Sequence, residues 1–233
     1  MKQALFVFVF LFAAAVLAQS TNRYETRDAF DRDGPNKFYM GRQLAHVMGH
    51  QAANWLERPE REEEERTETM VGLLGLKPGE NVADIGAGTG YIARRMAKRI
   101  NPGKVYCVEI QQEMLNLLAV EMKKASVTNY VPVLGTIEDP KLPTNALDLI
   151  IMVDVYHEFS HPFEMGEKMA LSLKTGGRLV FVEYKKEDPT VPIKEVHKMS
   201  EAQVKKEMSI FPLEHAVTHT NLPWQHVIVF KKK

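Results

Sequence analysis

Short apolar runs rich in Val and Ile alternate with amphipathic helical segments along most of this chain, and this alternation constrains the fold more than any other feature. Five strand-like runs come first, in the order NVADIG, KVYCVEI, YVPVL, ALDLIIMVDVY and GGRLVFVEY. Helical patterns lie between them at residues 91–100, 111–125 and 162–174. Such alternation favours right-handed crossovers, which build a parallel sheet with helices on both faces.

The pattern changes near the end of the chain. Ser200 and Gln203 have the spacing of a capping box, which predicts a helix over residues 200–208. Two strand-like runs, 214–219 and 225–231, then follow one another with no helix between them. Consecutive strands commonly pair in antiparallel fashion. The sequence therefore predicts an α/β fold with a mostly parallel sheet and an antiparallel last strand.

Size and charge limit the organisation and the partners. A chain of 233 residues, 45% of them hydrophobic, fits one globular domain with a small cap. Lys and Arg together number 30, as do Asp and Glu, so no overall field favours nucleic acid or an anionic membrane. The lone cysteine, Cys107, lies in an apolar run and is expected in the core. The oligomeric state stays open.

The first 18 residues, MKQALFVFVFLFAAAVLA, have the layout of a secretory signal peptide. An apolar helix of about 15 residues would be about 22 Å long, which is short of the ~30 Å hydrocarbon core. We therefore expect export to the periplasm or the medium. An uncleaved membrane anchor over residues 4–18 and a cytoplasmic protein with an apolar N-terminus are the alternatives.

Residues 19–58 are expected to form a polar arm and a helical cap, before the main domain at 59–233. A helical pattern runs from Tyr39 to Leu56, and on it Arg42, His46 and His50 are spaced by four. That spacing fits a metal pair, a cleft lining or a solvent-exposed polar stripe. The charge run EREEEER after Pro59 is interpreted as the solvated face of the next helix.

A glycine-rich turn, D84-I-G86-A-G88-T-G90, joins the first strand-like run to the helix that begins at Tyr91. Glycines permit a sharp turn and let a ligand lie against bare backbone at a helix N-terminus. A dinucleotide-binding turn would carry a small residue at the sixth position of G-x-G-x-x-G, where Tyr91 stands here.

Alternate glycines with an acid two residues before the first resemble motif I of the class I S-adenosylmethionine-dependent methyltransferases. Further elements in the same order extend the resemblance over residues 70–184: Glu109 at the end of the second strand, LGTIEDPKLP after the third, and the LKTGG turn into the fifth. The resemblance implies a three-layer Rossmann-like sandwich with a seven-stranded sheet, and S-adenosyl-L-methionine as cofactor. The cofactor-binding residues that it implies are Asp84, Gly86, Ala87, Gly88, Gly90, Glu109, Ile110, Thr136, Ile137, Glu138 and Asp154. One departure is Thr136, which stands where many members place an Asp for the adenine.

The stretch HEFSH, residues 157–161, matches the H-E-x-x-H signature of zinc proteases. It follows an apolar strand directly, and Pro162 suits the first turn of the next helix. His157 and His161 are therefore expected to straddle a strand-to-helix turn, and no metal is predicted. At the carboxyl edge of a central strand, His157 and Glu158 are candidate catalytic residues, with His157 as a general base. The alternative is a His that is simply hydrogen-bonded into the loop.

The acceptor site is predicted only in outline. By resemblance, the N-terminal segment and the insertion after the fifth strand set specificity, with Tyr39, Arg42, His46, His50 and Tyr184 as candidates. No N/D-P-P-F/Y sequence marks an amine acceptor, and no basic groove with aromatics indicates nucleic acid. We expect a methyltransferase acting on a small molecule. A non-catalytic cofactor-binding module and a secreted zinc hydrolase are the alternatives.

Overall fold

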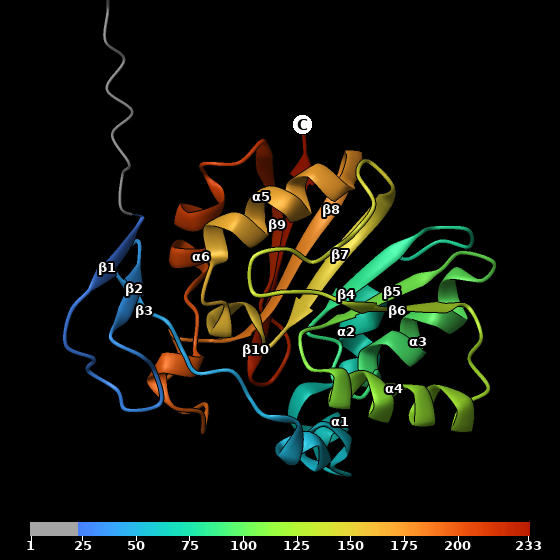
Figure 1. Cartoon of the computed structure of the whole chain (residues 1–233), viewed down its shortest axis with the longest axis horizontal. Coiled ribbons are helices and arrows are strands. Elements are labelled where there is room, and N and C mark those ends of the chain that lie inside the picture. Colours follow the sequence, from blue (N-terminus) through green and yellow to red (C-terminus); the bar gives the residue numbers. More distant parts are fainter. Residues whose placement is uncertain (1–22) are drawn as a thin grey trace, which may run out of the picture.

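The computed structural model describes residues 23–233, so the predicted signal peptide at 1–18 lies outside the described residues. Within 23–233, no helix is both long and apolar enough to cross a membrane. Figure 1 shows a central twisted sheet between helices, with a small N-terminal sheet at one side.

Seven strands form the central sheet in the order β6-β5-β4-β7-β8-β10-β9. Their bounds are β4 Val82–Ile85, β5 Val105–Glu109, β6 Tyr130–Leu134, β7 Leu147–Val153, β8 Leu173–Tyr184, β9 Leu213–His219 and β10 Gln225–Lys232. The first five pair in parallel, while β10 is antiparallel to both β8 and β9. The predicted fold class is therefore confirmed.

Helices cover both faces because the central strands are apolar on both sides. Alternate residues of β4 point to opposite faces, so Val82 joins one buried cluster and Ala83 joins the other. The first cluster includes side chains from α2 (Thr67–Leu73), α3 (Tyr91–Ile100) and α4 (Gln112–Lys124). The second includes side chains from α5 (Pro162–Ser172) and α6 (Glu201–Met208), whose N-cap Ser200 accepts from the Gln203 N–H as predicted.

The N-terminal segment differs from its prediction. The helix expected from Tyr39 to Leu56 is replaced by strands β2 (Lys37–Tyr39) and β3 (Arg42–Gln43), which form a small sheet with β1 (Tyr24–Thr26). Met40 and Gly41 have φ values of 46° and 96° and make the turn between β2 and β3. Left-handed backbone cannot continue an α-helix, so only the 3₁₀ helix η1 (His50–Glu57) remains of the predicted helix.

Two charged residues also differ from the prediction. The run EREEEER contains α1 (Arg61–Glu65), which ends at Arg66 in the left-handed conformation. Arg61 and Glu65 are buried, at 5% and 2% exposure, and form an ion pair of 2.7 Å. The interpretation of this run as a solvated face is therefore wrong for these two residues, which turn toward the carboxyl edge of the sheet.

Candidate functional site

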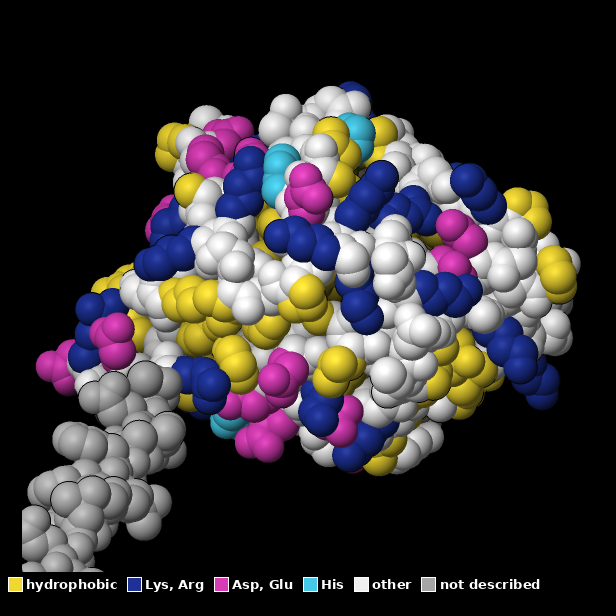
Figure 2. Space-filling view, turned by 90° about the horizontal axis from the view of Figure 1, so that it is seen from above, with side chains coloured by type: hydrophobic (Ala, Val, Ile, Leu, Met, Phe, Trp, Pro, Cys, Tyr) yellow, Lys and Arg dark blue, Asp and Glu magenta, His cyan; other side chains and the backbone are white. Residues whose placement is uncertain are grey.

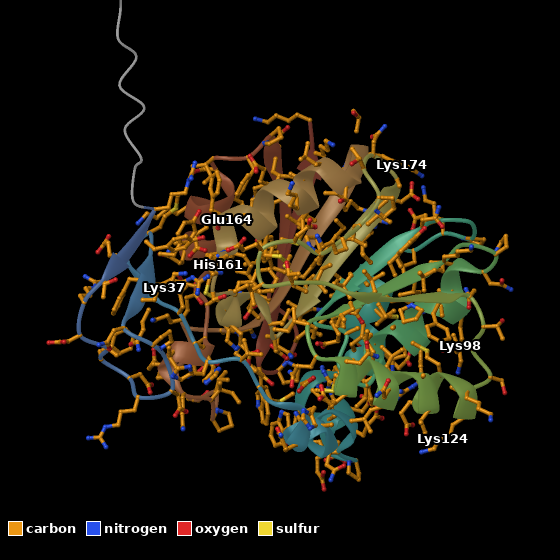
Figure 3. The ribbon with its side chains drawn as sticks, in the orientation of Figure 1. Lys37, Lys98, Lys124, His161, Glu164 and Lys174 are labelled. Atoms are coloured by element: carbon orange, nitrogen blue, oxygen red, sulfur yellow. The ribbon has the colours of Figure 1, made fainter. Side chains whose placement is uncertain are left out.

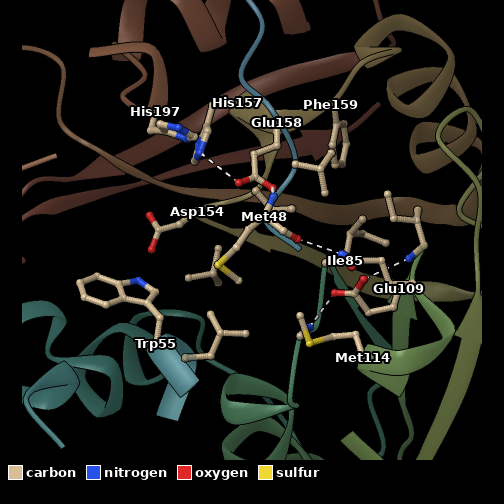
Figure 4. Close-up of a pocket in the computed structure, with 18 of the residues that line it drawn as sticks. Met48, Trp55, Ile85, Glu109, Met114, Asp154, His157, Glu158, Phe159 and His197 are labelled. Atoms are coloured by element: carbon tan, nitrogen blue, oxygen red, sulfur yellow. Dashed lines mark hydrogen bonds and ion pairs between the residues drawn. The ribbon is translucent and has the colours of Figure 1, made fainter. Parts of the chain in front are cut away.

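A cavity of about 430 Å³ lies at the carboxyl ends of β4, β5 and β7. In the strand order, β5 lies on one side of β4 and β7 on the other, so the cavity is at the point where the direction of winding reverses. Open α/β sheets bind their ligands at such a point. The N-terminal segment covers the cavity, and the insertion after β8, residues 185–199, closes one side. Figure 4 shows the convergence of these parts.

Several of the predicted site residues line this cavity. They are Gly86, Gly88, Glu109, Ile110, Thr136, Ile137, Asp154, His157, Glu158 and Tyr184. The remaining predicted cofactor residues, Asp84, Ala87, Gly90 and Glu138, do not line it. Asp84 lies in β4, and Ala87 and Gly90 lie in the turn that follows it. Glu138 has an exposed side chain whose carboxylate is 3.6 Å from His161 Nε2.

The glycine turn leaves its backbone open to the cavity. Gly86, Gly88 and Gly90 have φ values of 69°, 55° and 81°, which glycine adopts without steric cost. A Cβ on Gly86 would lie 2.4 Å from Val155 Cγ2, and one on Gly88 would lie 2.4 Å from Leu56 Cδ1. Side chains at these two positions would therefore collide with Val155 and Leu56 and push these lining residues into the cavity.

Two buried carboxyl groups flank the turn. Glu109 Oε1 accepts from the Gly88 N–H at 2.8 Å, and Glu109 Oε2 accepts from the Ile110 N–H at 3.1 Å. Burial raises the pKa of Glu109, while these backbone donors lower it. Asp84 Oδ2 is buried without a hydrogen-bond partner. Burial, with the Glu109 charge, raises the pKa of Asp84 to about 7.

Hydrogen bonds to Gln111 and to α3 hold the N-terminal segment over the cavity. Gln111 accepts from the His50 N–H and donates to the Met48 carbonyl, both at 2.9 Å. Glu57 accepts from Arg94 of α3 at 2.8 Å. Trp55, in η1, is 45% exposed, and the Arg58 guanidinium lies over its ring at 3.7 Å.

Residues 157–161, the HEFSH stretch, span the turn between β7 and α5, as predicted. Residues Tyr156–Glu158 form the short 3₁₀ helix η2, and His161 is the N-cap of α5. His161 contacts Ser160 Oγ at 3.0 Å and Lys37 Nζ at 3.3 Å. Figure 3 shows it beside Lys37 and Glu164, on the side of the N-terminal sheet. The two histidines therefore do not share a helical face.

His157 is buried and held from both ends. Its Nδ1 lies 2.7 Å from Glu183 Oε2, and its carbonyl accepts from the Ala45 N–H and from Arg42 Nη1, both at 3.1 Å. Its Nε2 is 4.0 Å from Glu158 Oε1. The other oxygen of Glu158 accepts from the Met48 N–H at 3.2 Å.

Burial favours the uncharged forms of the groups at this end of the cavity. It lowers the pKa of His157 to about 4 and that of His197, in the insertion, also to about 4. It raises the pKa of Glu158 to about 7 and that of Glu183 to about 8. Both imidazoles are therefore neutral at neutral pH.

Asp154 lies at the end of β7 in the left-handed conformation, with φ 53°. Its Oδ2 accepts from Gln225 at 2.7 Å, and its Oδ1 has no partner. Burial and the nearby carboxylates of Glu65 and Glu183 raise its pKa well above the usual range. The buried pair of Arg61 and Glu65 adjoins it at the cavity wall.

Four predicted acceptor residues do not line the cavity. Tyr39 is buried at 2% exposure and stacks on Tyr24 at 5.5 Å. Arg42 lies behind the site, where its Nε binds Glu207 Oε1 at 2.6 Å. His46 and His50 are not on one helical face with it, because the predicted helix does not form. The predicted acceptor role of Tyr39, Arg42, His46 and His50 therefore has no support in this geometry.

Sequence reasoning missed several lining residues. Gln111 directly follows a predicted strand, so the reasoning that placed Glu109 at the carboxyl edge of the sheet could also have placed Gln111 there. Met48 was assigned to a part of the predicted helix that does not form, whereas Leu56 lies in η1, the part that remains. His197 lies in η3 (Glu195–His197), and no spacing in the sequence relates it to His157.

Comparisons with known proteins agree with this geometry. Residues 82–177 match the family model described as "Methyltransferase domain". The ubiquinone/menaquinone biosynthesis C-methyltransferase UbiE from Ectopseudomonas mendocina is 30% identical over 118 residues, which are 50% of this chain and 46% of the relative. The enzyme of the same name from Cupriavidus taiwanensis is 27% identical over 117 residues, covering 50% and 48%. The chain thus spans about half the length of the curated relatives it matches.

Solved structures show the same fold. A SAM-dependent methyltransferase from Aquifex aeolicus superposes with a TM-score of 0.74 at 24% identity, covering 79% of this chain and 98% of that chain. The [4+2]-cyclase SpnF superposes with a TM-score of 0.61 at 14% identity, covering 71% of this chain and 81% of that chain. Residues 82–177 thus match a methyltransferase domain, and the chain has the Rossmann-like fold of the solved SAM-dependent methyltransferase from Aquifex aeolicus.

Proposed function

We propose that this protein transfers a methyl group from S-adenosylmethionine to a small-molecule acceptor bound in the same cavity. The observation that carries the proposal is that two kinds of residue line the same cavity. Gly86, Gly88 and Glu109 lie at one end of the cavity, and His157 and Glu158 lie at the other. About 430 Å³ lies within the range of about 300–1,000 Å³ that small-molecule sites occupy.

The residues present fit the cofactor. The glycine turn lines the cavity at Gly86 and Gly88, where a side chain would collide with Val155 or Leu56. Glu109, at the end of β5, is placed to accept hydrogen bonds from ribose hydroxyls. Asp154 Oδ1 has no partner and belongs to a side chain of the cavity wall. A cationic group bound beside it would lower the raised pKa of Asp154 and be stabilised by the carboxylate that results. S-adenosylmethionine supplies a methyl group on a positively charged sulfur.

Transfer is a displacement in which the acceptor atom forms a bond to the methyl carbon while the carbon–sulfur bond breaks and its electron pair stays on sulfur. A protonated acceptor must also lose its proton. His157 is uncharged at neutral pH and is held in place by Glu183, so it is the candidate to receive that proton. Alignment and exclusion of water supply much of the rate in such a reaction.

The acceptor is proposed to be a small molecule with an apolar body. Met48, Trp55 and Phe159 supply apolar surface to the cavity (Figure 4). Leu56 and Ile193 add to this surface. On the face shown in Figure 2, Lys and Arg are interspersed with Asp and Glu, in line with their equal numbers of 30. Export is also a proposal, and it rests on the first 18 residues. N-terminal sequencing of the protein from separated cell fractions would distinguish a cleaved signal peptide from an anchor.

A second candidate function is cofactor binding without methyl transfer. The fold is shared with a protein named as a cyclase, so the fold alone does not fix the reaction. The experiment that separates the two is incubation of the full chain with methyl-labelled S-adenosylmethionine and a panel of small phenols, quinols and aliphatic alcohols. Label in an acceptor, lost in Glu109→Ala, supports the methyltransferase. Saturable cofactor binding with no labelled product from the panel favours the binding module.

A further inference from the structure

We propose that His157, Glu158 and His197 form a site for one divalent first-row transition-metal cation at the acceptor end of the cavity. Each residue offers one donor atom, and the three atoms lie within 4.8 Å of one another. Among residues 23–233, these three are the one such group of His, Cys, Asp and Glu side chains. Figure 4 shows them side by side at the wall of the cavity.

The spacing is close to that of a bound ion. Two nitrogen or oxygen ligands at about 2.1 Å from a tetrahedral metal are about 3.4 Å apart. Donor atoms separated by up to 4.8 Å therefore need to approach by up to about 1.4 Å on binding. His157 and His197 already lie edge to face, with ring centroids 5.1 Å apart.

His157 is oriented as a metal ligand. Its Nδ1 is engaged by Glu183, whose other oxygen accepts from the Tyr156 N–H at 2.9 Å. This leaves Nε2 as the ring nitrogen on the side of Glu158 and the cavity. A carboxylate that holds the far nitrogen of a histidine is the usual outer partner of a metal-bound imidazole, because it fixes the ring and increases its basicity.

Glu158 is oriented in the same way. One of its oxygens accepts from the Met48 N–H, which fixes the carboxylate, and the other is the oxygen nearest His157 Nε2. The backbone of η2 is itself tied to β3 and its surroundings through Arg42 and Ala45. Two of the three ligands are therefore held in place before any ion arrives.

Two imidazoles and one carboxylate are a ligand set that suits zinc, cobalt, iron and manganese rather than calcium or magnesium. Three protein ligands leave at least one coordination position for a small molecule. All three residues line the cavity, so that position would be open to an oxygen of the acceptor. This last step rests on the proposed function, whereas the metal site itself does not. With an ion on Nε2, His157 has no free ring nitrogen to receive the acceptor's proton, and the ion would instead favour loss of that proton by lowering the pKa of the bound oxygen.

The site uses the first two residues of HEFSH but not the last. The third ligand comes from the insertion after β8, about forty positions further along the chain than His157. His161 is engaged by Ser160 and Lys37 instead. This difference provides a matched control, since a zinc-protease motif would need His161 and not His197.

The test is a titration of the chelator-treated full chain with Zn²⁺ by calorimetry, and with Co²⁺ by visible absorption. We expect one ion per chain with a Kd of 1 µM or below, and a loss of at least about 100-fold in affinity for His197→Gln and for Glu158→Gln. His161→Gln should bind as the unaltered chain does. Circular dichroism checks that each variant is folded, and the Co²⁺ spectrum of the unaltered chain reports nitrogen ligation without any variant.

Binding of S-adenosylmethionine to the metal-free chain is measured on the same samples. Cofactor binding without a zinc site overturns the metal proposal and leaves the proposed function standing. A zinc site without cofactor binding does the reverse. Loss of zinc in His161→Gln, or unchanged zinc affinity in His197→Gln, contradicts the assigned ligands.

Discussion

The two ends of the cavity are built in different ways. The cofactor end, defined by Gly86, Gly88 and Glu109, comes from one contiguous stretch, in which β4, a glycine turn, α3 and β5 follow one another. The acceptor end, defined by His157, Glu158 and His197, comes from two segments and is held by a third, the N-terminal segment around Met48. One end is made by backbone conformation, and the other by packing between distant segments.

This difference decides how each end responds to change. At the cofactor end, the cavity wall is a left-handed glycine backbone whose amides are already bonded to Val108 and Glu109, so the shape is lost when a Cβ is added. At the acceptor end, each side chain is positioned by another side chain or by a distant amide, as His157 is by Glu183. A change remote from the cavity can therefore alter the acceptor end alone.

Arg42→Ala should have the largest effect. Arg42 joins Glu207, which is fully buried, to the carbonyls of Tyr156 and His157. Its removal leaves the buried Glu207 without a cationic partner, with only Tyr156 and Gln203 still donating to it, which costs about 3–5 kcal/mol of unfolding free energy. Urea denaturation measures this loss. Arg27→Ala is the control, because its pair with Glu25 is 51% and 60% exposed and its removal should cost below about 1 kcal/mol. Equal losses in the two variants would contradict the account of the acceptor end.

Gly88→Val should reduce affinity for S-adenosylmethionine by at least about 100-fold, or about 2.7 kcal/mol. The residue has φ 55°, and its Cβ would meet Leu56 at 2.4 Å. Calorimetric titration gives the affinity. Gly72→Ala is a matched control, because a Cβ there meets nothing within 4 Å and should leave the affinity unchanged. Retained binding in Gly88→Val would place the cofactor elsewhere.

Asp84→Asn should change the pH dependence of stability. The folded-state pKa of Asp84 is raised from 3.8 to about 7, so the unfolded chain releases this proton at lower pH than the folded chain. Its contribution to stability is therefore lost as pH rises from about 4 to about 7. Relative to the unaltered chain, the variant should gain about 2 kcal/mol between pH 5 and pH 7. Urea denaturation at the two pH values checks this, and a constant difference would show that Asp84 ionises normally.

Glu109→Gln should have the smallest of these effects. The amide keeps one acceptor oxygen but loses the charge that strengthens hydrogen bonds to ribose hydroxyls, so we expect about a 10-fold loss of cofactor affinity, or about 1.4 kcal/mol. The control is Glu138→Gln, since that side chain is 59% exposed and does not line the cavity. The same titration measures both. A larger loss of cofactor affinity in Glu138→Gln than in Glu109→Gln would show that Glu138, and not Glu109, binds the cofactor.

The sequence predicted the cofactor end well because local pattern determines it. Residues 91–100 form α3 with the predicted bounds, and the apolar runs became the seven strands in an α/β order that fixes their carboxyl edge. The acceptor end was predicted only for His157 and Glu158. The contact of His197 with them depends on how a loop folds back over the sheet, and the periodicity near Tyr39 was overridden by the turn at Met40 and Gly41. Buried charges such as Arg61 and Glu65 are likewise set by tertiary pairing.

The central claim is that the cavity binds S-adenosylmethionine at the glycine turn and Glu109. The most direct measurement is calorimetric titration of the full chain with S-adenosylmethionine and with its demethylated product, in parallel with Gly88→Val and Gly72→Ala. The account predicts one saturable site with micromolar affinity in the unaltered chain and in Gly72→Ala, and no measurable site in Gly88→Val. Absence of binding in the unaltered folded chain, or equal binding in all three, would contradict it.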